Sequence, residues 1–139
     1  MSINLSERAK NAGCLAITSL VDVGTLNSNG YISIYTAPRP STTDSSSGSA
    51  TRLAIVPLAN PSFGTVANGE ALALGLNTSG VTVEATGTAS WYRIFDRDNN
   101  PIWDGDIGLT SSGSDMEFND LNFIKDGKVV VASFKAKMP

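Results

Sequence analysis

The sequence predicts a mainly β protein: an antiparallel β-sandwich or jelly-roll-like domain with one N-terminal helix. Helical spacing of apolar side chains is confined to the first 24 residues. Extended segments separated by turn residues then recur at short intervals, with no helical pattern between them. The length of 139 residues suits a single domain. We therefore expect a helical segment over residues 1–24 and a sandwich of roughly six to eight strands over residues 25–139.

The N-terminal segment carries one apolar stripe. Between Ile3 and Val23, apolar residues recur in steps of three or four, as on one face of an α-helix. The stripe consists of Leu5, Ala9, Ala12, Ala16, Leu20 and Val23. We expect the helix to pack along one open end or face of the sandwich, or to reach a neighbouring subunit.

The ends and the continuity of this helix follow from individual residues. Ser2 or Ser6 can cap the N-terminus, because a serine oxygen accepts a hydrogen bond from a free amide of the first turn. Gly24 is suited to end the helix in a left-handed conformation. Gly13 costs a helix roughly 1 kcal/mol relative to alanine. The segment is therefore either one continuous helix, two short helices, or a helix followed by a strand that begins near Cys14.

The first strand and the loop after it differ in composition. Residues 31–35 (YISIY) alternate tyrosine and serine with isoleucine, which is typical of a half-buried strand. Residues 36–50 combine two prolines with a tract of serine, threonine and glycine that has almost nothing to bury. We expect residues 36–50 to form an exposed, flexible loop. A loop of this length in a small domain is more often functional or disordered than neutral.

Further extended segments and one more loop complete the domain. The expected strands are 51–58, 70–76, 81–96, 101–107 and 128–136. Pro57 lacks the amide that a central strand needs, so it indicates an edge strand or a bulge. Gly87 is a candidate bulge. Residues 111–120 (SSGSDMEFND) are acidic and rich in serine, which predicts a solvated loop with Met116 and Phe118 directed inward.

Composition excludes several classes of protein. Ten basic residues against thirteen acidic ones, with a net charge of -3, argue against a nucleic-acid partner. The single cysteine, Cys14, excludes an intrachain disulfide framework, and its apolar neighbours predict a buried structural thiol. No apolar run reaches the ~18 residues of a membrane span, and no signal-type segment opens the chain. We expect no membrane partner and synthesis in a cytoplasm.

Residues 92–108 hold a cluster of aspartates and asparagines that resembles a calcium loop. With Asp96 at the first position of an EF-hand loop, Asp98 and Asn100 fall at the third and fifth. Pro101 then replaces the required glycine, and Ile107 replaces the bidentate glutamate. A β-hairpin turn, in which Asp and Asn bond nearby amides, explains the stretch better. These three residues remain candidates for a weak, adventitious calcium site, and we expect no dedicated metal or cofactor.

Catalysis has little support in the sequence. The chain has no histidine, which excludes the usual general base, the His-supported serine nucleophile and the usual zinc sites. Glycoside hydrolysis needs two carboxylates, and Asp104 with Asp106, or Asp115 with Glu117, could place two on one face of a strand. Carboxylates with this spacing are more commonly the solvated face of a strand. We therefore expect a protein that is not an enzyme.

The two tryptophans allow two interpretations. Trp91 and Trp103 could form a platform on which a sugar stacks, as in a lectin. Aromatic residues in β-strands are more often part of the core or of cross-strand pairs. A core role is therefore the favoured interpretation.

The order of the segments carries a family resemblance. A helical N-terminus ending in VDVGT precedes GYISIYTAPRPST, TRLAIVPLANPSFGTVANGEA, ATGTASWYRIFDRDNNPIWDGDIG and GKVVVASFKAKMP. Over nearly the whole chain, this succession resembles a family of small virion structural proteins of tailed bacteriophages, similar to capsid decoration (cement) proteins. The chain departs from the pattern at Gly13, within the helix.

The resemblance implies a structural function. Such proteins are β-sandwich or jelly-roll modules that sit as homodimers or homotrimers on the outer capsid surface and tie adjacent capsomers together. The implied partners are the major capsid protein and further copies of the chain. Loop 36–50 and residues 1–10 are the segments expected to order on contact with partners.

Two alternative functions remain open at this point. The first is a tail or baseplate accessory protein, which would share the sandwich and the loops. The second is a carbohydrate-binding module on the virion surface, which needs Trp91 or Trp103 exposed beside Asp104 and Asp106.

Overall fold

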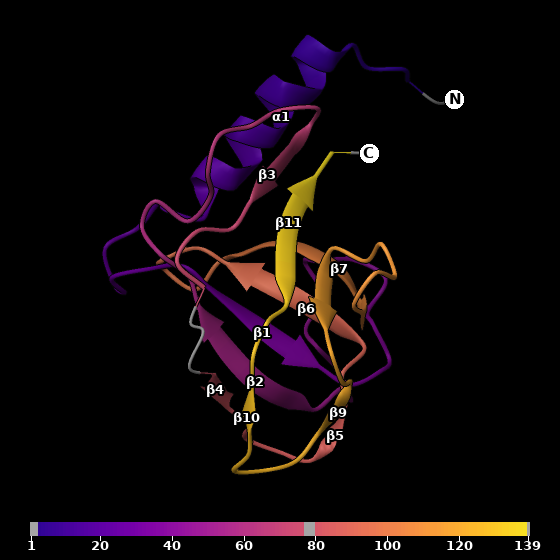
Figure 1. The fold of residues 1–139 in the computed structure, drawn as a ribbon. Helices are drawn as coiled ribbons and strands as arrows, with labels where there is room; N and C mark the ends of the chain where they lie inside the picture. Colours follow the sequence, from indigo (N-terminus) through magenta and orange to yellow (C-terminus); the bar gives the residue numbers. More distant parts are fainter. Residues whose placement is uncertain (1–2, 77–79, 139) are drawn as a thin grey trace.

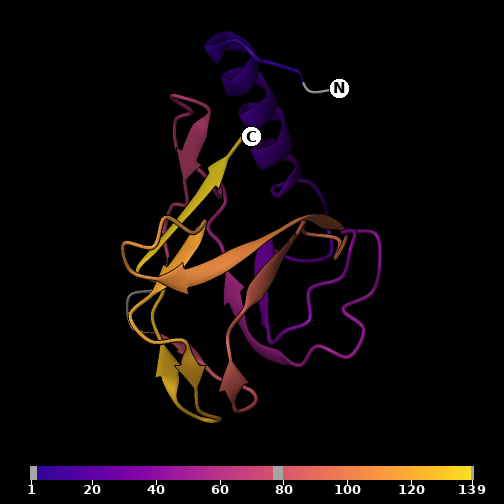
Figure 2. The same ribbon diagram turned by 90° about the vertical axis from the view of Figure 1, so that its right-hand side faces the viewer.

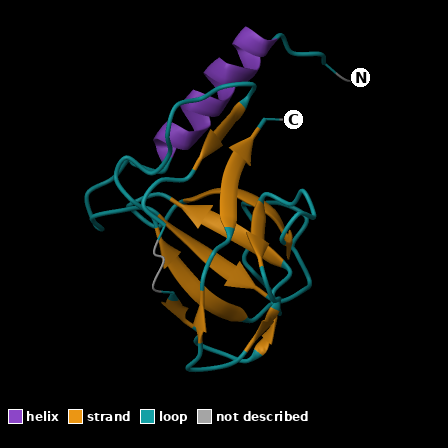
Figure 3. Ribbon diagram, in the orientation of Figure 1, coloured by secondary structure: helices purple, strands orange, loops and turns teal. Residues whose placement is uncertain are grey.

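A computed structural model of the chain describes residues 3–76 and 80–138. The fold is mainly β with one N-terminal helix, as predicted (Figure 1, Figure 3). The helix is α1 (Glu7–Leu20), and it is too short to cross a membrane. The strands are β1 (Tyr31–Tyr35), β2 (Arg52–Pro57), β3 (Glu70–Leu72), β4 (Val81–Thr82), β5 (Gly87–Thr88), β6 (Trp91–Phe95), β7 (Pro101–Leu109), β8 (Met116–Phe118), β9 (Asn122–Phe123), β10 (Lys128–Val129) and β11 (Ser133–Lys137).

Seven strands form one large curved sheet in the order β2-β1-β6-β7-β8-β11-β3, and β10-β4 and β5-β9 form two small sheets. Because the large sheet curves, β11 lies in a second layer across from β1 and β2 (Figure 1, Figure 2). The expectation of a wholly antiparallel arrangement is wrong at one pair, since β8 runs parallel to β7. The loop 110–115 brings the chain back beside Ile107, so that β8 then runs alongside β7 in the same direction. The Thr110 amide donates to the Phe118 carbonyl.

The core lies between the two layers and is rich in aromatic rings. Ile32 and Ile34 of β1 are fully buried against it. The rings of Tyr92 and Phe134 meet edge to face at 5.1 Å between centroids, which joins the two layers. The opposite face of β1 is also covered, because Ser33 is 1% exposed. The strand is therefore buried on both faces and not half-buried as predicted.

The first strands follow the prediction closely, and the later ones are shorter. β1 matches residues 31–35, and Pro57 lies at the edge of the large sheet, as expected for a proline. The predicted strand 81–96 divides into β4, β5 and β6, so Gly87 begins a short strand and is not a bulge. Backbone groups between the pieces bond to different segments: the Val83 amide donates to Gly127 and the Ala89 amide to Leu121.

Other predicted segments are redistributed in the same way. The segment 70–76 shortens to β3, and 128–136 divides into β10 and β11. Residues 111–120, predicted to be a loop, contain β8, whose Met116 and Phe118 are buried as expected.

The helix is continuous through Gly13, so the alternatives of two helices or an early strand are wrong. A Cβ on Gly13 would lie 2.8 Å from Met138 Cε, so glycine lets the end of the chain approach the helix. Ser6 is the N-cap, and its Oγ accepts from the Ala9 amide at 3.1 Å; Ser2 lies outside the described residues. The helix ends at Leu20, before Gly24, so Gly24 does not terminate it.

The predicted apolar stripe of the helix faces solvent. Within α1, the buried side chains are Cys14 and Thr18. Cys14 Sγ lies 3.7 Å from the Ala136 carbonyl of β11, and the Thr18 hydroxyl donates to the Cys14 carbonyl at 2.8 Å. These small side chains let α1 pack closely on β3 and β11 at one end of the molecule (Figure 1). The stripe faces away from β3 and β11 because its residues lie on the side of the helix opposite Cys14 and Thr18.

Candidate functional site

The predicted calcium residues form a hairpin turn between β6 and β7. Asp96 Oδ1 accepts from the amides of Asp98 and Asn100, both at 2.9 Å. Asp96 Oδ2 accepts from the Asn100 side-chain amide at 3.2 Å. Both oxygens of Asp96 therefore hold the turn. Among the described residues, no group of three or more His, Cys, Asp and Glu side chains could hold a metal ion.

Asp98 fastens the segment that follows α1 to this hairpin. Its Oδ1 accepts from the amides of Leu26 and Thr25 at 2.9 and 2.8 Å. Those two backbone hydrogen bonds lower the pKa of the Asp98 carboxyl. A Cβ on Gly24 would lie 2.7 Å from the same oxygen, which explains a glycine at this close approach. The hairpin tip is thus an internal fastener between the helix and the sheet.

The predicted pair Asp104 and Asp106 is divided between two arginines. The Asp104 side chain is 3% exposed and accepts from Arg93 Nε at 2.6 Å and Nη2 at 2.9 Å. The Asp106 side chain is 74% exposed and pairs with Arg39 Nη1 at 2.8 Å. One carboxylate is therefore a buried structural ion and the other is a surface ion, so the two do not face a shared substrate position.

The second predicted pair, Asp115 and Glu117, is also divided. The Tyr92 hydroxyl donates to Asp115 Oδ2 at 3.1 Å. Burial is the main cause of the raised pKa of Asp115, and burial also raises the pKa of Tyr92. Glu117 instead accepts from the Gly113 amide at 2.9 Å, which lowers the pKa of its carboxyl.

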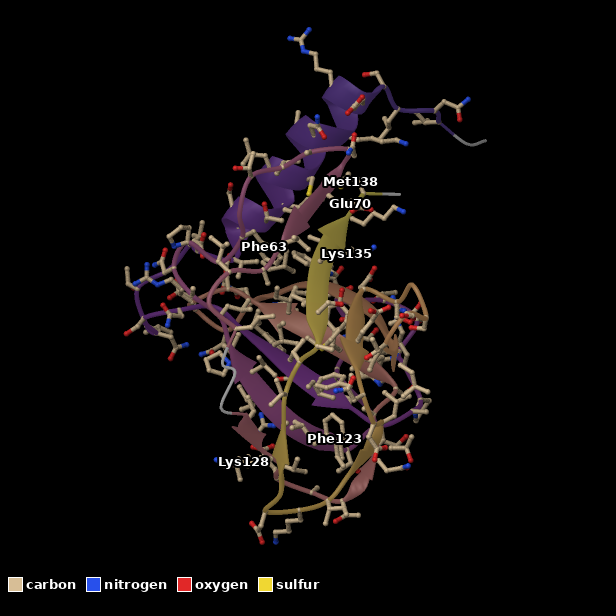
Figure 4. The ribbon with its side chains drawn as sticks, in the orientation of Figure 1. Phe63, Glu70, Phe123, Lys128, Lys135 and Met138 are labelled. Atoms are coloured by element: carbon tan, nitrogen blue, oxygen red, sulfur yellow. The ribbon has the colours of Figure 1, made fainter. Side chains whose placement is uncertain are left out.

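A cavity of about 210 Å³ lies between α1 and the strands β7 and β11. Its lining includes Cys14, Trp103 and Asp115, with Met138 at the end of β11 beside the helix (Figure 4). The Trp103 Nε1 donates to the Tyr92 hydroxyl at 3.0 Å, so the polar groups here already bond to one another. The sequence does not indicate that Trp103 of β7 and Asp115 of loop 110–115 line one cavity, because that depends on where the loop lies.

The tryptophans do not form an exposed platform. Trp91 is 1% exposed, stacks on Tyr35 with 4.4 Å between ring centroids, and donates from Nε1 to the Thr36 carbonyl at 2.8 Å. Trp103 is half-buried and packs against the Phe63 ring. The core interpretation is confirmed for Trp91, and Trp103 lies at the cavity under the helix.

Loop 36–50 is exposed, as predicted, and it is tied to the sheet beneath it. Arg93 Nη1 donates to the Ser45 carbonyl at 2.6 Å, and Nη2 donates to the Thr42 carbonyl at 3.3 Å. The Arg93 guanidinium also lies 5.4 Å from the centroid of the Trp91 ring. Sequence reasoning missed Arg93, whose signal was a lone cation between two aromatic residues of a strand. Mobility of the loop stays a prediction.

Exposed large apolar side chains are most numerous in the N-terminal segment, and two others lie at the opposite end of the molecule. Among the described residues, six of the eleven exposed large apolar side chains precede residue 27. These six are Ile3, Leu5, Leu15, Leu20, Val23 and Leu26. The predicted apolar stripe shares Leu5, Leu20 and Val23 with this group and adds three alanines. We call this stripe the helix surface, and each of its residues is exposed: Leu5, Ala9, Ala12, Ala16, Leu20 and Val23.

The second group lies at the opposite end. Ile124, in the turn between β9 and β10, is 68% exposed, and Val130, directly after β10, is 45% exposed. We call these two residues the distal surface. Figure 4 shows Lys128 of β10 and Phe123 of β9 at this end, far from Met138 beside α1. The molecule thus presents apolar side chains at both of its ends.

Comparison with known proteins yields no match to a family model, a curated protein or a solved structure.

Proposed function

We propose that the protein is a structural component of a tailed-phage virion that binds the outer capsid surface and ties adjacent capsomers together. Its partners in this proposal are the major capsid protein and further copies of the chain. The observation that carries the proposal is the pair of exposed apolar surfaces at opposite ends of one β domain. The order of the sequence segments, which resembles decoration proteins, supports the same function.

A bridging protein needs at least two separate contact surfaces and a stiff body between them. Exposed apolar side chains that cluster are typical of protein–protein contact sites. The large sheet supplies the stiff body, because its β1 strand is buried on both faces and its aromatic core joins the two layers. Force applied at one end would therefore reach the other end with little internal rearrangement.

The proposed mechanism is mechanical. Contacts that span two capsomers must be broken before the capsomers separate, so they oppose outward pressure from packaged DNA. Each contact is small, but a bound copy held at two points dissociates more slowly than a copy held at one. The net charge of -3 fits an outer surface, since an acidic protein is not drawn to DNA.

The carboxylates also fit a structural protein better than an enzyme. Asp96, Asp98 and Asp104 each accept hydrogen bonds that hold segments of the chain together. The proposed function needs no cofactor and no catalytic group.

Binding to capsids that lack the protein tests this function. We expect the wild-type chain to co-sediment with such capsids and to raise the temperature at which they rupture. The double variant Ile124→Ser, Val130→Ser should bind more weakly, because it removes the apolar side chains of the distal surface. Leu72→Ser, an exposed strand residue outside both surfaces, is the matched control and should bind like the wild type.

Two results would contradict the proposal. If the protein bound only to tails, the accessory alternative would replace it. If binding were absent and glycan titration quenched tryptophan fluorescence, the carbohydrate alternative would gain support. The buried position of Trp91 argues against the second result.

A further inference from the structure

We infer that the cavity under α1 binds a small aromatic ammonium ion, that is, one aromatic ring with a protonated amine on a short arm. The ammonium group would contact the Asp115 carboxylate, and the ring would fill the space between α1 and β11. This inference does not depend on the proposed capsid function, because it concerns a ligand held within the domain and not a contact surface.

Asp115 has one carboxylate oxygen available to a ligand. The residue is half-buried and lines the cavity. The Tyr92 hydroxyl donates to Oδ2 at 3.1 Å, and the Tyr92 oxygen itself accepts from Trp103 Nε1 at 3.0 Å. This network directs the single Tyr92 proton toward Asp115, which acts as the acceptor at its end. Within residues 3–76 and 80–138, no group donates a hydrogen bond to Asp115 Oδ1.

The Asp115 carboxylate also lacks a cation partner, because the basic side chains around it pair with other carboxylates. These pairs are Arg39–Asp106, Lys135–Glu70 and Lys137–Glu70, with N···O distances of 2.8, 4.0 and 3.5 Å. Burial raises the pKa of Asp115 by more than the Tyr92 hydrogen bond and the charges of Lys135 and Arg39 lower it. A bound cation would supply the missing opposite charge and stabilise the ionised carboxyl.

The other polar side chains that line the cavity already have partners. The Thr18 hydroxyl donates to the Cys14 carbonyl at 2.8 Å. The Asp104 carboxylate binds the Arg93 guanidinium. Asp115 is therefore the polar group that selects the ligand. An anion would be repelled by it, and a neutral ring would leave its carboxylate without a cation.

The size and lining of the cavity fit one aromatic ring. Its apolar lining comes from α1, β7 and the end of β11: Cys14, Ile17, Trp103, Ala136 and Met138. A cavity of about 150 Å³ with an apolar lining holds benzene. The cavity under α1, at about 210 Å³, has room for a ring and a short arm. An apolar space with one open polar group is typical of a small-molecule site.

Isothermal titration calorimetry with benzylammonium chloride tests the ligand class. We expect one ion to bind per chain. It should bind at least about tenfold more tightly than benzyl alcohol, since a hydrogen bond between two ions is stronger than one from a neutral hydroxyl. Benzoate should not bind. Equal affinity for benzylammonium and benzyl alcohol would overturn the inference.

A second probe separates a free aromatic amine from the lysine side chain of another protein. Butylammonium has the shape of a lysine side chain and lacks the ring. It should bind at least several-fold more weakly than benzylammonium, because it buries less apolar surface. Equal affinity of the two ions would mean that the ring has no role and would overturn the aromatic assignment.

Three variants test the location of the site. Asp115→Asn keeps the shape of the side chain and should weaken benzylammonium binding by at least about tenfold. Ile17→Trp fills the cavity without a change of charge and should also weaken binding. Asp126→Asn makes the same charge change in an exposed turn at the far end and should bind like the wild type. Circular dichroism and thermal unfolding check that each variant is folded. Unchanged binding in both cavity variants would overturn the inference.

Nuclear magnetic resonance gives a readout that does not depend on a variant. The chain has two tryptophans and therefore two indole N–H signals. Benzylammonium should shift the Trp103 signal. The Trp91 signal should stay in place, because Trp91 is 1% exposed and its indole donates to the Thr36 carbonyl. A shift of Trp91 alone, or of neither signal, would contradict binding under α1.

The outcomes for the ligand and for the capsid are separable. If none of the probes bound, the inference would fail and the proposed capsid function would be unaffected. If benzylammonium bound as described but the chain never bound capsids, the inference would stand and the proposed function would fail.

Discussion

At the scale of single residues, the fold depends on a few buried polar side chains that hold segments far apart in the sequence. Arg93 is the clearest case, because its guanidinium bonds to Asp104 and to two carbonyls of loop 36–50. Burying an ion pair is costly, and removing one partner leaves the other charge uncompensated. The arginine thus ties the loop to the sheet only while Asp104 is present.

Removal of Asp104 should therefore destabilise the protein strongly. Asp104→Ala should lower the free energy of unfolding by about 3–5 kcal/mol, as measured by urea denaturation. Asp106→Ala, which removes a surface partner two residues further on, should cost at most about 1 kcal/mol. Equal effects of the two variants would contradict the structural role of the buried pair.

Asp115 should give the stability a specific pH dependence. Burial raises the pKa of its carboxyl, so the folded state holds this proton more tightly than the unfolded state does. Stability from this group is present at low pH and is lost as the pH rises from the ordinary aspartate range through the raised pKa. Asp115→Asn should remove this loss.

The check is to measure urea unfolding of the wild type and of Asp115→Asn from acidic to neutral pH. The stability of the variant relative to the wild type should increase as the pH rises. Asp98→Asn serves as the control and should show the opposite trend, because two backbone hydrogen bonds lower the pKa of the Asp98 carboxyl. A difference between Asp115→Asn and wild type that is constant across the pH range would contradict the raised pKa.

At the scale of elements, α1 shows how a local cost is offset by packing. Glycine at position 13 weakens the helix, yet it admits the Met138 side chain. Gly13→Ala alone should change the free energy of unfolding little, since the gain in helix propensity is opposed by the displaced methionine. In a Met138→Ala background, the same substitution should stabilise the protein by up to about 1 kcal/mol. A double-mutant cycle measures this coupling, and additive effects would argue against the contact.

Loop 36–50 gives a second prediction at this scale. Because Arg93 holds the carbonyls of Thr42 and Ser45, the loop should exchange its amide hydrogens and be cleaved by protease faster once that arginine is displaced. Arg93→Met should accelerate cleavage within residues 36–50 relative to the wild type. Arg39→Met, at the exposed pair with Asp106, should have a smaller effect. Equal cleavage rates in the wild type and Arg93→Met would show that Arg93 does not restrain the loop and would contradict this prediction.

At the scale of the whole molecule, the sequence predicted the composition of the fold better than its connections. Alternation of tyrosine and serine with isoleucine located β1, and the short apolar run of residues 53–56 located β2. The parallel β7–β8 pair depends on how loop 110–115 turns, which periodicity does not contain. The apolar periodicity predicts the helix, but periodicity alone does not determine whether the apolar face packs on the chain's own body or faces outward.

The site residues illustrate the same limit. The hairpin interpretation of Asp96, Asp98 and Asn100 was correct because turn chemistry is local. The division of Asp104 and Asp106 between Arg93 and Arg39 was not foreseen, because it depends on where loop 36–50 lies. Local rules predict local contacts, whereas contacts between distant segments require the fold.

The most direct test of the proposed capsid-bridging function is cryo-electron microscopy of capsids that lack the protein, imaged after addition of the purified chain. We predict regular density on the outer shell at local symmetry positions, with each copy spanning adjacent capsomers and the β9–β10 end against the capsid. Bare shells, or density confined to the tail, would contradict capsid bridging.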